Sequence, residues 1–192
     1  MANSAPKFMP LIALLAAAGC GGEERTLDER LFGVWTASDH GNQYKLTFNS
    51  DGTFAADTER AVRAVQGEYW ISGGDTLVFE GVDQAGQPAR IAGMLFLTST
   101  TVVPRAMTPI GSRVGFIGYW STRDGALSYE FRGENLVIRR ELLGDNKSQS
   151  LISKGAWQQA SANKVEVTFP DPSVSGTLEL FAGGVLGQPF HR

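Results

Sequence analysis

From residue 31 onward the chain consists of short runs with a two-residue hydrophobic period, separated by turns that contain glycine. Tyr44, Leu46 and Phe48 are apolar positions with polar residues between them. Because successive side chains of a strand point to opposite faces, this pattern predicts a half-buried β-strand. Asn49-Ser50-Asp51-Gly52 follows and predicts a hairpin turn, since Asp-Gly tolerates the positive φ that tight turns need.

The same pattern recurs along the rest of the chain. Strands are predicted over 66–72 and 76–82, on either side of the hairpin turn Gly73-Gly74-Asp75. Residues 57–65 fit either a short helix or a hairpin return, and no stretch shows a helical apolar stripe longer than two turns. The pattern predicts an all-β fold of roughly ten to twelve antiparallel strands. The further predicted strands cover 91–103, 114–122, 126–131, 136–143, 150–159, 164–169 and 174–181.

Two motifs of the first half return in the second. Gly33-Val34-Trp35 is matched 85 residues later by Gly118-Tyr119-Trp120, and Gly67-Glu68-Tyr69-Trp70 is matched 88 residues later by Gly155-Ala156-Trp157. Chance similarity is the alternative, because glycine and aromatic residues are common in any barrel. A true repeat favours a closed antiparallel barrel with two similar halves, since closure removes exposed strand edges.

Two segments in the middle of the chain depart from simple alternation. Residues 91–97 are apolar on both faces, so the outer face needs cover from a loop, a second subunit or a partner. Residues 103–111 contain Pro104 and Pro109 and predict a long loop at one mouth of the barrel. Long loops are often functional, so this loop is the expected place for any specificity.

The chain begins with one basic residue, Lys7, followed by a short apolar run over 8–19. A membrane-spanning helix needs roughly 20 apolar residues, whereas a signal peptide needs only about 7 to 15. Ala17-Ala18-Gly19-Cys20 resembles the lipobox of bacterial lipoproteins, in which the cysteine receives a diacylglyceryl group. The alternative is an ordinary secretory signal with Cys20 as a buried or stray thiol, although an unpaired cysteine is unusual in a secreted protein.

The lipobox resemblance implies a domain organisation and a location. Residues 1–19 would be the signal peptide, 20–30 the lipidated Cys20 and a flexible tether, and 31–192 a single β-barrel domain. Gly21 is not the aspartate that, in that family, is associated with retention in the inner membrane. We therefore expect a protein of the bacterial cell envelope, lipid-anchored in the outer membrane, with its domain in the periplasm or at the surface.

A second resemblance concerns the domain itself. Leu31-Phe32-Gly33-Val34-Trp35, then residues 46–54, 67–71 and 75–77, resemble the bacterial lipocalin-like domains, which begin with Gly-x-Trp and often follow a lipoprotein signal. The resemblance implies a lipocalin-like or calycin-like antiparallel meander barrel that binds a small hydrophobic molecule. The aromatic residues expected inside the barrel, and hence the candidate ligand-binding residues, are Trp35, Phe48, Tyr69, Trp120 and Phe131.

The same large rings could instead fill the barrel. The protein would then be a structural or interaction module that docks another envelope protein through its outer surface. Alternation places Trp70 on that outer surface, where it would either contact a partner or be covered by a loop such as 103–113.

Catalytic and metal chemistry have little support in the sequence. His40 lies beside a predicted turn and His191 near the end of the sequence, while Glu134 and Glu141 show no sign of converging as an acid and base pair. We expect no enzyme activity, no cofactor and no metal site. The formal net charge of −3 without a clustered basic face also excludes nucleic acid as a partner.

Overall fold

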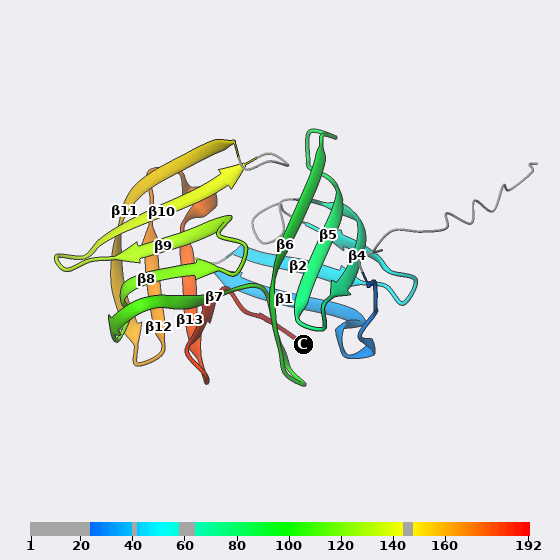
Figure 1. Cartoon of the computed structure of the whole chain (residues 1–192), viewed down its shortest axis with the longest axis horizontal. Coiled ribbons are helices and arrows are strands. Elements are labelled where there is room, and N and C mark those ends of the chain that lie inside the picture. Colours follow the sequence, from blue (N-terminus) through cyan, green and yellow to red (C-terminus); the bar gives the residue numbers. More distant parts are fainter. Residues whose placement is uncertain (1–23, 40–41, 58–63, 144–147) are drawn as a thin grey trace, which may run out of the picture.

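A computed structural model of the chain describes residues 24–39, 42–57, 64–143 and 148–192 (Figure 1). Within these ranges the regular structure is β-strand apart from two short turns, which confirms the predicted all-β antiparallel barrel class. Two single 3-10 turns, Glu29–Leu31 and Pro172–Val174, complete the regular structure. The strands are β1 (Gly33–Asp39), β2 (Asn42–Phe48), β3 (Thr53–Ala56), β4 (Gln66–Ser72), β5 (Thr76–Val82), β6 (Pro88–Leu97), β7 (Thr101–Val114), β8 (Ile117–Thr122), β9 (Leu127–Phe131), β10 (Leu136–Leu143), β11 (Gln149–Ser161), β12 (Lys164–Thr168), β13 (Gly176–Phe181), β14 (Val185–Gly187) and β15 (Phe190–His191).

The strands form two closed circuits that share β7. In the first circuit β1 to β6 follow one another, and β7 and β15 close the ring between β6 and β1. In the second circuit β7 to β14 follow one another, and β14 pairs back onto β7. We call these the first and the second barrel; they lie side by side, the first on the right of Figure 1 and the second on the left.

Strand β7 passes from one barrel to the other along its length. Residues 101–106 pair with β6 and β15 in the first barrel, and residues 107–114 pair with β8 and β14 in the second. Strand β7 has a bulge at this point, because two of its residues, Pro104 and Arg105, lie opposite the single residue Leu95 of β6. A proline is tolerated at such a bulge because the ladder is already interrupted there.

This strand corrects the prediction of a long loop over 103–111. Pro104 lies at the bulge, and Pro109 lies beyond Met107, the last residue of β7 that pairs with β14. Neither proline therefore removes a hydrogen bond from a continuous central ladder. The segment is not a mouth loop but the strand that joins the two barrels.

Each barrel has a hydrophobic core of its own. The first core contains Leu31, Trp35, Phe48, Tyr69 and residues of β5, together with Phe190 from the far end of the chain. The second is built of the residues Met107, Phe116, Trp120, Leu127, Tyr129, Phe131, Val137, Val165, Val167, Phe169, Leu178 and Leu186. The two halves suggested by the sequence repeat are thus two separately packed barrels.

Equivalent residues of the two barrels occupy equivalent places in their sheets. In the first barrel Gly33 pairs with Phe48, and Phe48 with Phe54; in the second Gly118 pairs with Phe131, and Phe131 with Val137. The next strand supplies a glycine in both cases, Gly67 opposite Phe54 and Gly155 opposite Val137.

The tryptophans that begin each half make the same hydrogen bond. The indole nitrogen of Trp35 donates to the carbonyl of Leu31 at 2.6 Å, and that of Trp120 donates to the carbonyl of Phe116 at 2.9 Å. Both carbonyls lie four residues before their tryptophan, so the contact repeats with the motif. The repeat is therefore present in three-dimensional structure and not only in sequence.

The apolar run over 91–103 is two strands rather than one. A tight connection at 98–100, closed by a hydrogen bond from Thr98 N–H to the Thr101 carbonyl at 2.8 Å, separates β6 from β7. The outer face of β6 is covered by the other barrel of the same chain, since the Phe96 ring lies 4.8 Å from that of Phe181 in β13. The alternatives considered for 57–65 fall largely on residues outside the described part.

Candidate functional site

The five aromatic residues expected to line one cavity divide between the two barrels. Trp35, Phe48 and Tyr69 belong to the first core, whereas Trp120 and Phe131 belong to the second. Each is 0–1% exposed. They pack against neighbouring core residues, as where the Phe48 and Tyr69 rings meet edge to face at 4.7 Å. The structure therefore does not bring the five together in one site.

Tyr69 shows how the barrel interior satisfies its polar groups. Its hydroxyl donates to the carbonyl of Asn49 at 2.9 Å, just after β2. Burial, with smaller contributions from the charges of Asp51 and Asp28, raises the pKa of Tyr69 to about 12. In the second barrel the indole nitrogen of Trp157 makes the corresponding bond to the Arg132 carbonyl at 2.9 Å. In both barrels the polar atom of this side chain therefore hydrogen-bonds to a backbone carbonyl of the same barrel.

Trp70 lies on the outer face of β4, and of the two alternatives for it the covered one is confirmed. It is only 2% exposed. The guanidinium of Arg25, in the segment before β1, lies over its ring at 3.9 Å, and that of Arg90 lies 5.8 Å away. The chain's own arginines cover Trp70, and the predicted cover by residues 103–113 is wrong because those residues form β7.

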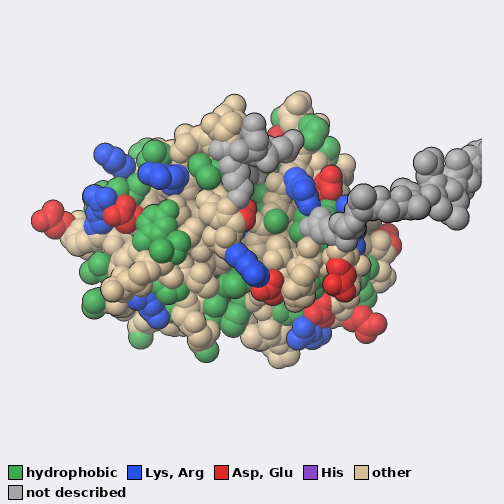
Figure 2. Space-filling model, viewed as in Figure 1, with side chains coloured by type: hydrophobic (Ala, Val, Ile, Leu, Met, Phe, Trp, Pro, Cys, Tyr) green, Lys and Arg blue, Asp and Glu red, His purple; other side chains and the backbone are tan. Residues whose placement is uncertain are grey.

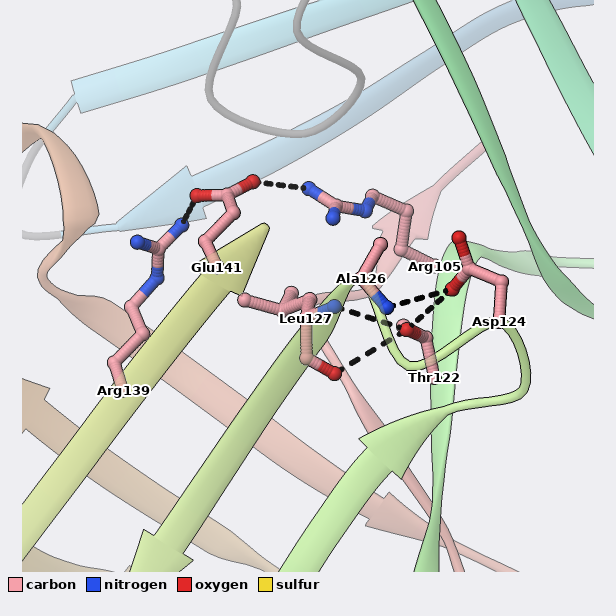
Figure 3. A network of polar contacts seen from close by, with 7 residues as sticks. All are labelled: Arg105, Thr122, Asp124, Ala126, Leu127, Arg139 and Glu141. Carbon is pink, nitrogen blue, oxygen red and sulfur yellow. Dashed lines mark hydrogen bonds and ion pairs between the residues drawn. The ribbon is translucent and has the colours of Figure 1, made fainter. Parts of the chain in front are cut away.

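A buried network of charged groups lies at one end of the second barrel (Figure 3). Glu141 of β10 is flanked by two arginines: Arg105 Nη1 lies 3.1 Å from its Oε1, and Arg139 Nη2 contacts its Oε2. The side chains of Arg105, Arg139 and Glu141 are 10%, 7% and 1% exposed. Beside them the Thr122 hydroxyl bonds to Asp124 and to the Leu127 backbone, which fixes the turn between β8 and β9.

The network projects inward because of strand alternation. Val137, Arg139 and Glu141 occupy every second position of β10, and Val137 is part of the second core. Arg139 stands directly opposite Tyr129 of β9. Burial lowers the pKa of the Arg139 guanidinium, but nearby Tyr129 and Glu141 raise it by more, so its pKa is above the ordinary value. Arg139 is therefore a permanent buried cation.

The network is incomplete as a hydrogen-bonded unit. Three buried nitrogens, Nε of Arg105 and Nε and Nη1 of Arg139, have no acceptor in the part of the chain that the structure describes. Among the described residues, its ion pairs join two arginines to one glutamate. Sequence reasoning missed this site, although the inward alternation of Val137, Arg139 and Glu141 was a signal that could have found it.

A crevice of about 270 Å³ lies where the two barrels meet. Its lining includes charged groups: Lys164 and Glu179, partners on adjacent strands, form an ion pair at 3.5 Å, and Nδ1 of His191 lies 3.2 Å from the Thr101 hydroxyl. The lining residues are Ala37, Ser38, Ala160, Lys164, Glu166, Thr177, Glu179, Gln188, Pro189 and His191. None of the five predicted aromatic residues is among them.

Of the remaining candidate groups, Glu134 and Glu141 lie in the described part of the chain. Glu134 lies in the turn before β10 and Glu141 near the far end of that strand, so the two carboxylates do not converge. In the described residues, no group of three or more His, Cys, Asp or Glu side chains could hold a metal ion. His40 and Cys20 lie outside the described part of the chain.

The surface has a mixed character. The face shown in Figure 2 carries acidic and basic side chains interspersed with apolar ones. A search of the described residues for a helix long and apolar enough to cross a membrane found none. Comparisons with protein-family models, with curated proteins and with solved structures found no match to this chain. Its function is therefore inferred from its own residues.

Proposed function

We propose that this chain is a lipoprotein of the bacterial envelope, anchored through Cys20, whose two barrels act as an interaction module for another envelope protein. The first motive is the lipobox-like sequence before a polar tether. The second is that both barrel interiors are filled by the aromatic residues expected to line a cavity, all 0–1% exposed. A filled barrel acts through its outer surface.

The observation that carries the docking role is a group of exposed apolar side chains on the β7–β8 hairpin. Ile110 pairs with Tyr119 and Val114 pairs with Ile117, so the four side chains share the outer face of one hairpin. All four are exposed, and Val114 is 80% exposed. We call these four residues the hairpin patch; the hairpin of β7 and β8 that carries it is at the left of Figure 1. Exposed apolar groups clustered on one element mark interaction sites more often than scattered ones do.

A crosslinking experiment in intact envelopes tests the docking role. A photoreactive residue replaces Val114 in the hairpin patch, and in a matched control it replaces Val34, a 47% exposed valine on the first barrel. We expect a discrete protein adduct from position 114 and none from position 34. Adducts only with lipid, or the same pattern from both positions, would refute docking to a protein.

The anchor has a separate test. Cys20→Ser removes the proposed lipid attachment site, so the variant should leave the membrane fraction while the unaltered chain remains there. Unchanged membrane partition would contradict the anchor.

The alternative of a small hydrophobic ligand predicts a different result. Titration with fluorescent hydrophobes and fatty acids would then change tryptophan emission saturably, because Trp35 and Trp120 lie inside the barrels. We expect no such change, because both rings are enclosed by other side chains. A saturable change would favour the hydrophobic ligand over the interaction module.

A further inference from the structure

The buried network of the second barrel holds two arginines whose donors are not all paired. Among the described residues, Arg105 and Arg139 form ion pairs with the carboxylate of Glu141. Asp171 also feels the charge of Arg139, although the pKa of this carboxyl is lowered chiefly by its hydrogen bonds to Ser173. Buried guanidinium groups are costly when part of their hydrogen-bonding capacity has no acceptor.

The unpartnered nitrogens show which kind of group is missing. Nε of Arg105 and Nε and Nη1 of Arg139 are donors, and a buried donor without an acceptor destabilises the folded state. A guanidinium presents its N–H groups as a planar fork that matches the oxygens of a carboxylate or a phosphate. A small oxyanion would supply the missing acceptors and place a negative charge beside the two arginines.

Comparison of the two barrels indicates that the buried charge is not a requirement of the architecture. Tyr129 and Arg139 are cross-strand partners, each two residues from the Phe131–Val137 pair. The corresponding partners in the first barrel, two residues from the Phe48–Phe54 pair, are Leu46 and Ala56. The first barrel closes at this position with apolar residues only. The charged group is therefore present at one of two equivalent positions and absent from the other.

We propose that Arg105 and Arg139 form a binding site for a small oxyanion, of the carboxylate or phosphate class, at the end of the second barrel. The oxyanion accepts hydrogen bonds from both guanidinium groups and shares them with Glu141. Because the unpartnered nitrogens are closed to solvent, binding requires the arginine side chains to move. Arg105 extends from β7 and Arg139 from β10, so they can separate without a change in either strand.

Thermal unfolding of the whole chain tests the site. Melting temperatures are measured at pH 7 and constant ionic strength in sodium chloride, sodium acetate and sodium phosphate. We expect acetate, phosphate or both to raise the melting temperature saturably, as ligands that bind only the folded state do. A response to acetate alone assigns a carboxylate ligand, and a response to phosphate alone assigns a phosphate.

Variants separate the site from general salt effects. Arg139→Gln and Arg105→Gln should abolish the saturable response, whereas Arg140→Gln should retain it because Arg140 is exposed on the same strand. Phosphate also stabilises proteins by exclusion from their surface, but that effect does not saturate and would be equal in all variants. An equal response in all variants, or none in the unaltered chain, would overturn the proposal.

Nuclear magnetic resonance of the unaltered chain tests the site without variants, so its result does not depend on whether a variant folds. The Nε–H signals of two buried arginines should shift saturably with acetate or phosphate and not with chloride. The absence of any such shift would also overturn the proposal. None of these outcomes depends on Cys20 or on the hairpin patch, so the site and the proposed function can fail separately.

Discussion

Replacement of the two equivalent tryptophans by phenylalanine should cost the same free energy in both barrels. Trp35→Phe and Trp120→Phe each remove one buried hydrogen bond to a carbonyl four residues earlier. Each ring also lies under an arginine: Arg192 is 4.4 Å from the Trp35 ring, and Arg113 is 5.0 Å from the Trp120 ring. The two sites therefore lose matching interactions.

The magnitude follows from these contacts. A lost hydrogen bond contributes about 1 kcal/mol, and the smaller ring leaves a partly filled space worth about 1–2 kcal/mol. We expect a loss of about 2–3 kcal/mol of unfolding free energy in each variant. Trp70→Phe is the control, since Trp70 is also buried but its indole nitrogen has no acceptor among the described residues. This control should lose only about 1 kcal/mol or less, because the cost of the partly filled space is offset by removal of a buried donor that has no acceptor.

Urea unfolding followed by circular dichroism measures the three losses. The midpoint of unfolding should fall for Trp35→Phe and Trp120→Phe by similar amounts, with an unchanged dependence on denaturant. A Trp70→Phe variant as unstable as the other two would show that ring volume, and not the repeated hydrogen bond, sets the cost. A difference above about 1 kcal/mol between Trp35→Phe and Trp120→Phe would refute the energetic equivalence of the two halves.

Three further predictions concern the buried polar groups and the two equivalent glycines. Glu141→Gln leaves two buried guanidinium groups without a carboxylate and should cost about 3–5 kcal/mol in urea unfolding; a loss under about 1 kcal/mol would contradict a buried ionic network. Because the pKa of Tyr69 is raised from 10.0 to about 12, the folded chain holds this proton more tightly, so its contribution is complete below pH 10 and is lost as the pH rises to 12. Urea titrations at successive pH values should show a loss of up to about 2 kcal/mol of unfolding free energy over this range. The loss should disappear in Tyr69→Phe and persist in the control Tyr119→Phe, whose ring is exposed. Gly67→Ala and Gly155→Ala should each prevent stable folding at 37 °C, as judged by thermal melts, because the added Cβ would lie 2.1 Å and 2.2 Å from a backbone oxygen of the next strand; a normal melt for either would mean that the strands can separate.

The local elements of the fold could be predicted where the hydrophobic period and the turn residues agree. The predicted bounds of the hairpin over 66–72 and 76–82 are those of β4 and β5. The Asn49 to Gly52 turn is also confirmed, with Gly52 at a φ of 85°. Both depend on interactions between residues close in sequence, which the pattern of a single chain records.

The closure of two barrels could not be predicted in the same way. It depends on β7, where Pro104 and Pro109 suggested a loop, and on β15, two residues that pair with strands from the start and the middle of the chain. A proline is excluded from a continuous ladder but not from a bulge or a free edge, and the sequence does not reveal which of these applies. The repeat motifs marked two halves without showing that each half closes on itself.

For the candidate sites too, features set by neighbouring residues could be predicted, whereas features set by barrel closure could not. Alternation placed Tyr69 inside and Trp70 outside correctly, but the assumption of one shared interior joined residues that lie in different barrels. The Arg105–Glu141 contact links positions 36 residues apart on strands that are not neighbours in the sheet. Such a contact depends on the curvature of the closed barrel, which hydrophobic period alone does not define.

The shared strand and the late closing strand impose an order on folding. The second barrel can close once β14 reaches β7, but the first barrel must wait for residues 190 and 191, which lie between β7 and β1. Arg192 then seals the start of the first barrel by donating to the Phe32 carbonyl at 2.6 Å. The half that is synthesised first is thus completed last. Truncation by a few residues near position 190 would leave the first barrel with two open edges, while every strand of the second barrel remained present.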